Sequence, residues 1–408
     1  MKIYWKFLVC SLLIVFLLPC LVMAQRGVPV TERARPDYDA NGIQAGAFII
    51  EPELKVGTEY NDNIYATKVG DKESDFIFLF APAVYSRSNW SVHSLGLGAE
   101  LKAGLYASES DENFVDGRLF LDGRMDVSRG SFLVAYAGIE RLHEDRTDPD
   151  TQPLWDEPGI YYRGIGSLNY QHGIGRFSVN AGTGVSVYDY RSVDRIDGAT
   201  DDQDDRDRNI YNVNARLTYN MHPDVSPFIT TRYDWRRYDA SDVERDSEGT
   251  RIGIGTGFDL GGVTSMEVYA GYMHQNYDDR SNISGFWYGL DLLWNPTQLT
   301  SVQASAMSSI KETTLGEASG IDAIDASLRV DHELLRNLLL GAFIGYTRND
   351  YENVDLTEEF FSAGPRVTYL WNRNFSAEAG YTYREKDSDV RFREYTQNLF
   401  TVSVTGRF

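Results

Sequence analysis

Hydrophobic and polar residues alternate with a period of two along most of this chain. In residues 400–408 apolar or small residues fall at even positions and polar ones at odd positions, and the chain stops on the aromatic Phe408. From 115 to 127 the odd positions are apolar or small and the even ones mainly charged. A period of two puts neighbouring side chains on opposite faces of a β-strand. Charges at every second position are excluded from a dry core, so these strands have one apolar face and one wet face.

The same alternation divides the chain after residue 43 into segments of strand length. Each is about 14 to 17 residues long, near the length of a tilted strand that crosses a bilayer. The segment 131–146 is ambiguous in phase, because Phe132 and Leu133 are both apolar. The predicted strands are 45–60, 74–88, 91–107, 113–127, 131–146, 158–172, 175–192, 207–222, 226–240, 247–261, 264–279, 282–296, 298–313, 319–332, 337–352, 357–372, 374–389 and 393–408.

The connections alternate between tight turns and longer acidic loops. Tight turns include 128–130, 172–175 and 295–297, and longer loops include 147–157 and 193–206. Such alternation is typical of periplasmic turns and extracellular loops in membrane β-barrels. In lipid an unpaired strand edge leaves backbone groups without partners, so a spanning sheet must close. The pattern therefore predicts an all-β, antiparallel transmembrane barrel of about 18 strands (about 16 to 18), wide enough to hold an aqueous channel.

The N-terminus has the pattern of a secretory signal. Lys2 and Lys6 precede an apolar run, and Val22-Met-Ala24 forms a small-residue cleavage site. Both cysteines, Cys10 and Cys20, lie inside it. We therefore expect a signal peptide at 1–24, a periplasmic leader at 25–42 and the barrel at 43–408. The mature chain then has no disulfide framework and no cysteine-ligated metal.

Composition supports export and a barrel. After the signal no run approaches the ~18 apolar residues of a membrane-spanning helix, yet the chain holds 26 Tyr, 20 Phe and 36 Gly. Tyr and Trp near strand ends are expected to form aromatic girdles at the two membrane interfaces. The formal charge of −21 argues against nucleic acid, which requires clustered Lys and Arg. The predicted girdle residues are Tyr60, Tyr106, Tyr170, Tyr219, Trp235, Trp294, Tyr369, Trp371 and Tyr383.

Charged residues on the predicted wet face are the candidate pore lining. They carry both signs, so they are consistent with a wall that selects solutes and equally with a salt-bridged network that only braces the barrel. Neighbouring aromatic residues at 188, 190, 238 and 287 are possible sugar-stacking positions. The lining candidates are Glu51, Lys55, Glu100, Lys102, Arg118, Asp122, Arg124, Arg216, Arg232, Arg236, Arg251, Asp259, Asp291, Arg329, Arg366, Glu378 and Arg384.

Other candidate sites are weaker. The carboxylates of Asp201, Asp202, Asp204 and Asp205 could hold a hard cation such as Ca²⁺, but interleaved arginines favour a solvated loop that makes the outer mouth negative and attractive to cations. His143 and His274 lie near acidic residues at the predicted extracellular rim, a possible catalytic arrangement; such pairs arise readily by chance in an acidic chain. We expect no cofactor and no enzymatic activity.

Several stretches resemble a known family. They are Arg35-Pro-Asp-Tyr-Asp-Ala-Asn-Gly-Ile43, Tyr60-Asn-Asp-Asn-Ile-Tyr65, Leu142-His-Glu-Asp-Arg146 and Asp331-His-Glu-Leu-Leu-Arg-Asn337. The chain resembles the putative beta-barrel porin 2 family of bacterial outer-membrane proteins over nearly all of its mature length. The resemblance implies a pore or an export role, since some members are associated with exopolysaccharide production or export. The alternation in 400–408 is similar to the C-terminal signal that the barrel assembly machinery recognises, carried here by Phe400, Val402, Val404 and Phe408.

These observations predict a porin-like channel of a Gram-negative outer membrane that passes small hydrophilic solutes passively. The alternatives are a conduit or accessory for exopolysaccharide export and a non-conducting structural or adhesive barrel. A passive porin requires a loop folded into the barrel, and 193–206 is the longest candidate. The expected partners are outer-membrane lipid, lipopolysaccharide, the barrel assembly machinery and the transported solute or polysaccharide.

Overall fold

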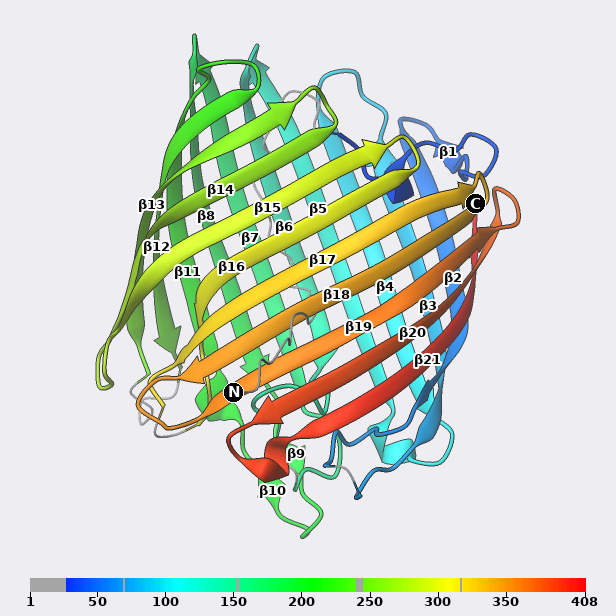
Figure 1. Cartoon of the computed structure of the whole chain (residues 1–408), viewed down its shortest axis with the longest axis vertical. Helices are drawn as coiled ribbons and strands as arrows, with labels where there is room; N and C mark the ends of the chain where they lie inside the picture. Colours follow the sequence, from blue (N-terminus) through cyan, green and yellow to red (C-terminus); the bar gives the residue numbers. More distant parts are fainter. Residues whose placement is uncertain (1–26, 69, 152–153, 240–244, 316–317) are drawn as a thin grey trace, which may run out of the picture.

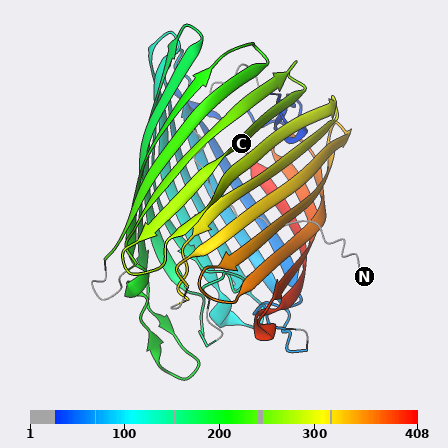
Figure 2. The same cartoon turned by 60° about the vertical axis from the view of Figure 1, so that its left-hand side comes forward.

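The computed structural model describes residues 27–408 apart from residues 69, 152–153, 240–244 and 316–317. The predicted signal peptide, residues 1–24, lies outside the described residues. The described chain folds into a single tilted barrel of strands with connections at both ends (Figure 1; Figure 2). No helix in the described part has the length and apolar character needed to cross a membrane.

The wall of the barrel is one antiparallel sheet. Within the described residues this sheet has 19 strands; β1 (Ile43–Ala45) pairs only with β2, which leaves 18 in the wall, as predicted. The wall strands are β2 (Phe48–Asn61), β3 (Asp75–Ser88), β4 (Ser94–Tyr106), β5 (Phe114–Ser128), β6 (Ser131–His143), β7 (Ile160–Ile174), β8 (Phe177–Tyr190), β11 (Arg208–Tyr219), β12 (Val225–Tyr238), β13 (Ser247–Leu260), β14 (Thr264–Tyr277), β15 (Ile283–Thr297), β16 (Thr300–Lys311), β17 (Ile321–Leu335), β18 (Leu338–Tyr351), β19 (Thr357–Leu370), β20 (Phe375–Ser388) and β21 (Tyr395–Arg407).

The sheet closes where its first and last wall strands meet. β2 pairs with β21 from Glu53 opposite Arg407 to Asn61 opposite Leu399, so neither strand has an open edge there. In Figure 1 the red β21 accordingly lies beside the blue β2. Closure supplies each strand with two hydrogen-bonded neighbours, which is the condition for a sheet to lie in lipid.

Tight turns lie at one end of the barrel and longer loops at the other. The connections at 129–130, 175–176 and 298–299 are turns, whereas 62–74, 144–159 and 191–207 are loops. The loop after β8 contains the small hairpin β9 (Val193–Asp194) and β10 (Thr200–Asp201). We call the two ends the turn side and the loop side.

The two faces of the wall differ as the alternation predicts. Large apolar side chains protrude from the outer face, among them Phe286, Ile254 and Ile139, with exposed fractions of 82%, 67% and 62%. In a membrane these side chains contact lipid. Ile139 also settles the phase of β6, because Phe132 then faces inward, where it is buried. The outer face carries Phe400, Val402, Val404 and Phe408 as well, all exposed.

One predicted girdle residue lies on the wrong face. Tyr106 pairs with Ile77, which is buried between the exposed Phe76 and Phe78 and therefore faces the lumen. Residues opposite each other in a sheet share a face, so Tyr106 faces inward and the prediction for it is wrong. The alternation of β4, with Leu97, Leu101 and Leu105 outward, already places position 106 on the inward face, so its nearness to the strand end was not sufficient ground for a girdle position.

Candidate pore and its charged lumen

The predicted lining residues all lie in the inward register of their strands. Pairing between neighbouring strands shows this, because residues opposite each other share a face. Lys55 of β2 lies opposite Thr405 of β21, and Glu378 of β20 lies opposite Ser403 of β21. The same pairing places Glu100 opposite Arg118 and Arg232 opposite Arg251. Their part in conduction stays a prediction.

Many of these inward charges are paired. Glu378 lies 3.3 Å from the Lys55 ammonium and 3.8 Å from the Arg366 guanidinium. Arg216 of β11 reaches along the wall to Glu267 of β14 with two N···O distances of 2.9 Å. Such bidentate pairs hold a guanidinium in one orientation. The lumen therefore has a wall of both signs, partly cross-braced by its own ion pairs.

A loop crosses the loop-side opening. The loop at 144–159 leaves β6, and its Asp150 accepts hydrogen bonds from the Thr314 backbone N–H at 3.0 Å and the Thr314 hydroxyl at 2.8 Å. Thr314 belongs to the loop between β16 and β17, on a distant part of the ring. Arg393, before β21, donates to the Pro149 carbonyl at 3.1 Å. We call residues 144–159 the crossing loop.

Two buried ion pairs hold the base of the crossing loop. Glu144 binds the Arg206 guanidinium, with one N···O distance of 2.9 Å, and both side chains are buried. Arg146 binds Glu112 of the loop before β5 and donates to the Trp155 carbonyl at 3.0 Å. Burial alone would lower the pKa of Arg206, but the hydrogen bond and charge of Glu144 outweigh it and raise that pKa. Arg206 therefore keeps its positive charge at neutral pH.

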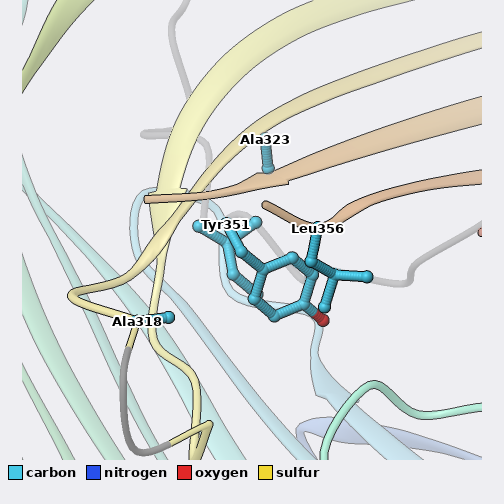
Figure 3. Packing of buried hydrophobic residues seen from close by; sticks show 5 residues of the cluster. Ala318, Ala323, Tyr351 and Leu356 are labelled. Carbon is cyan, nitrogen blue, oxygen red and sulfur yellow. The ribbon is translucent and has the colours of Figure 1, made fainter. Parts of the chain in front are cut away.

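The far support of the crossing loop is itself packed. Ala318, Ile321, Ala323, Tyr351 and Leu356 form a buried cluster between the loops that follow β16 and β18. In Figure 3 the Tyr351 ring lies beside Leu356, with Ala318 and Ala323 around it. The Tyr351 hydroxyl also donates to Glu358 at 3.1 Å. The crossing loop thus docks on a fixed platform.

The prediction that 193–206 is the inward loop is wrong for most of that segment. The β9–β10 hairpin extends from the loop side, clear of the wall (Figure 1), and Ile196 at its tip is exposed. Val193, Gln203 and Arg206 near the two ends of the segment are buried, and Arg206 binds Glu144 at the base of the crossing loop. Length alone made 193–206 the candidate, whereas the loop that crosses is held by a few specific contacts.

The leader occupies part of the turn-side opening. Val30 is fully buried, and its backbone N–H donates to the inward Ser301 hydroxyl at 2.7 Å. Arg35 forms a buried ion pair of 2.9 Å with Glu333 at the end of β17. From there the chain runs to β1 beside β2. Residues 27–42 therefore run along the rim from the turn between β13 and β14, which Gly27 approaches, past β17 to β2, taking up part of the cross-section.

The candidate cation loop does not gather its carboxylates. Asp201 accepts a hydrogen bond from the Trp155 indole at 2.9 Å, and Asp205 lies 3.3 Å from the Arg245 guanidinium. In the described part of the chain no group of three or more His, Cys, Asp or Glu residues is arranged to hold a metal ion. The aspartates are engaged separately, so the structure offers no support for Ca²⁺ here.

The rim histidines have other partners. His143 hydrogen bonds Asp116 at 2.8 Å and stacks on Phe114 with ring centroids 3.8 Å apart. His274 faces outward and bonds the Ser284 hydroxyl at 2.7 Å. Neither arrangement joins a histidine, a nucleophile and a carboxylate.

Comparison with known families supplies the decisive observation. The sequence model described as putative beta-barrel porin 2 matches residues 35–408, which is nearly the whole described chain. The chain belongs to this family. It is a β-barrel porin of the bacterial outer membrane.

Comparison with solved structures finds distant likenesses. OpdL of Pseudomonas aeruginosa is 12% identical with a TM-score of 0.46, over 89% of this chain and 100% of that one. OccK2 (OpdF) of Pseudomonas aeruginosa is 13% identical with a TM-score of 0.47, over 88% and 98%. The siderophore receptor PirA of Pseudomonas aeruginosa is 10% identical with a TM-score of 0.45, over 92% and 81%. Identity and score are too low for these likenesses to indicate a substrate. No curated protein matches the porin.

The family stretches found in the sequence become intelligible in the porin. Arg35 and Glu333, from two different stretches, form the ion pair that holds the leader. Glu144 and Arg146, from a third, anchor the crossing loop. Asn63, from the fourth, bonds across the closing seam to the Thr396 carbonyl at 3.0 Å. Sequence reasoning found the stretches but not these pairings.

Proposed function

We propose that the porin passes small hydrophilic solutes passively and that the crossing loop sets the narrowest point of the route. The observation that carries this proposal is the docking of Asp150 on Thr313 and Thr314, which carries one loop across the loop-side opening. A barrel of this strand number encloses an aqueous channel, and a fixed loop across it limits the size of what passes. Exopolysaccharide export and a non-conducting barrel are not favoured by the family match.

Two further roles belong to the same proposal. The outward Phe400, Val402, Val404 and Phe408 of the last strand serve as the segment that the barrel assembly machinery recognises. No catalysis is assigned to the rim, since the contacts of His143 and His274 do not bring a histidine, a nucleophile and a carboxylate together. The acidic loops, with a chain charge of −21, favour cations at the outer mouth.

Single-channel conductance of the refolded porin in a planar bilayer tests the narrowing role. Asp150→Ala removes the bonds to Thr313 and Thr314, so the crossing loop is expected to move and the conductance to rise, about twofold in a wide barrel whose resistance lies mainly at its narrowest part. Asp197→Ala is the matched control, because Asp197 is an exposed loop carboxylate paired with Arg195 at 2.8 Å.

Unchanged conductance in Asp150→Ala, with folding intact, would contradict the assignment of the crossing loop as the narrowest point. A folded wild-type barrel that never conducts would contradict passive passage. Equal effects of Asp150→Ala and Asp197→Ala would indicate a general response to lost negative charge.

A further inference from the structure

Arginines concentrate on one part of the lumen wall, formed by β12 and β13. Arg232 and Arg251 are register partners on neighbouring strands, and both face inward. Like charges directly opposite each other in a sheet destabilise it. Arg236 lies on the same face of β12, four residues further toward the loop side. Three guanidinium groups therefore share a small area of the lumen.

Carboxylates neutralise this area only in part. Asp234 lies between the arginines, 3.4 Å from the Arg236 guanidinium and 3.8 Å from that of Arg251. Arg236 is also bound by Glu312 from the loop after β16. Among the described residues Arg232 forms no hydrogen bond or ion pair, and its Nε is buried without a partner. Three positive groups face two negative ones around the Arg232–Arg251 pair, whereas Asp291 and the Arg216-bound Glu267 lie beside Tyr269, on its turn side. The arginine end of the area therefore carries excess positive charge where water is restricted, which favours an anion there.

Two aromatic rings, tilted against each other, lie over glycines of the wall beside these arginines. Tyr269 of β14 and Trp287 of β15 are 4.9 Å apart between ring centroids. Glycines make room for them: a Cβ on Gly253 would lie 3.3 Å from the Trp287 ring, and one on Gly289 would overlap the Tyr269 ring. Because Gly253 is two residues from Arg251 on the same inward face, the rings begin about 7 Å along the strand from it.

We propose that this area, formed by Arg232, Arg251, Tyr269 and Trp287, binds a small carboxylate that has a flat apolar face. The carboxylate pairs with Arg232 and Arg251, which present fork-shaped donors. The ring of the solute stacks on Trp287 and Tyr269, since sugar C–H faces and aromatic rings both bury well against indole. An acidic sugar and an aromatic acid share this chemistry. The site rests on the proposed function only in that solutes must enter the lumen.

Isothermal titration calorimetry of the refolded porin in detergent tests the site without requiring conduction. Galacturonate is expected to bind and galactose, its neutral counterpart, not to. Arg232→Gln and Arg251→Gln are each expected to weaken galacturonate binding about tenfold, which corresponds to about 1.4 kcal/mol. Arg124→Gln is the matched control, because Arg124 is an inward arginine of β5 already paired with Asp126 at 2.7 Å.

The aromatic half of the site is tested separately. Trp287→Leu is expected to weaken galacturonate and benzoate binding about fivefold, within the energy of one lost stacking contact, and to leave the weaker acetate binding unchanged. Phe343→Leu, an inward aromatic of β18, is the control. Tighter binding of galacturonate than of benzoate would identify an acidic sugar as the solute, and the reverse an aromatic acid.

Several outcomes overturn the proposal. Equal binding of galacturonate and galactose would overturn it. An equal loss of binding in Arg124→Gln and Arg251→Gln would also overturn it, provided that all variants keep the heat-modifiable mobility of a folded barrel. A porin that conducts but does not bind galacturonate or benzoate overturns the site and leaves the channel intact. A porin that binds them but does not conduct supports the site and contradicts passive passage.

Discussion

Asp148 is the residue of the crossing loop whose charge is most sensitive to pH. Burial, reinforced by the neighbouring Asp145 and Glu144 carboxylates, raises its pKa to about 8. Its carboxylate also accepts a hydrogen bond from the Asp145 backbone N–H at 2.9 Å. Asp148 is therefore mostly protonated at neutral pH, beside other acids of the same loop.

This pKa predicts a pH-dependent selectivity. As the pH rises through about 8, Asp148 gains a negative charge, so the preference for cations should increase. Because the folded-state pKa is raised, folding holds this proton more tightly than the unfolded chain does. The contribution of Asp148 to stability therefore falls as the pH rises from about 4, the ordinary pKa of an aspartate, to about 8, and it levels off above that pH. Reversal potentials in a salt gradient between about pH 6 and pH 9 measure the selectivity. In Asp148→Asn the step near pH 8 should be absent; a wild-type profile without a step there would contradict the prediction.

At the residue scale, the sequence predicts well which face of the sheet a side chain lies on, but it predicts poorly which residues that side chain contacts. The period of two is enough to assign Arg232 and Arg251 to the wet face, because the side-chain repeat of a strand is fixed by its geometry. Nothing in that pattern states that they become register partners, since register depends on where each strand ends. The raised pKa of Asp148 arises only after its loop brings Asp145 and Glu144 around it.

At the scale of elements, the seam between β2 and β21 is where the barrel is closed. The loop after β2 reinforces it: Asn63 is fully buried and donates to the carbonyls of Thr67 and Thr396, and the Gln397 side chain donates to the Asn63 carbonyl at 2.7 Å. Asp62 accepts two hydrogen bonds from Asn398, at 2.6 and 2.7 Å. The Tyr60–Tyr65 stretch thus ties the first wall strand to the last.

Replacing Asn63 tests this seam. Asn63→Ala leaves the Thr67 and Thr396 carbonyls without their donor, which should destabilise the folded barrel by about 2 kcal/mol. Heat-modifiability gels measure the temperature at which the compact, folded form disappears. This temperature should be lower in Asn63→Ala than in the wild type. Asn209→Ala is the control, because Asn209 bonds Asp239 in an exposed position away from the seam. If the transition temperature fell equally in both variants, Asn63 would have no special part in closure.

Elements were predictable because alternation persists through every wall strand. The predicted set contains each one, with ends displaced by a few residues, and the alternation of turns and loops gave the correct arrangement of the two ends. The crossing loop was not recognised, because a loop has no repeating pattern to indicate its path. Its course depends on Glu144, Arg146 and Asp150, single residues with partners far along the chain.

At the scale of the whole molecule, both openings of the barrel are narrowed by segments without strand periodicity. The crossing loop spans the loop side and the leader lies along the turn side. The sequence predicted a periplasmic leader at 25–42 but did not indicate where on the barrel it docks. Its docking depends on Glu333, which lies 298 positions further along the chain than Arg35, and no local pattern can indicate a partner at that distance.

The leader should therefore limit conduction from the periplasmic end. Arg35→Ala leaves Glu333 buried without its partner, and breaking a buried ion pair in this way costs about 3–5 kcal/mol, enough to release the leader from the wall. Arg336→Ala is a matched control, since Arg336 approaches the same carboxylate at 3.8 Å but is exposed to solvent, where a pair contributes little. Single-channel recordings should show higher conductance for Arg35→Ala and wild-type conductance for Arg336→Ala. Limited proteolysis should cut near residue 35 only in Arg35→Ala. A leader that is released without any change in conductance would show that it adds nothing to the resistance of the crossing loop. An Arg35→Ala leader that stays protected would show that Val30 and Arg33 hold it without the ion pair.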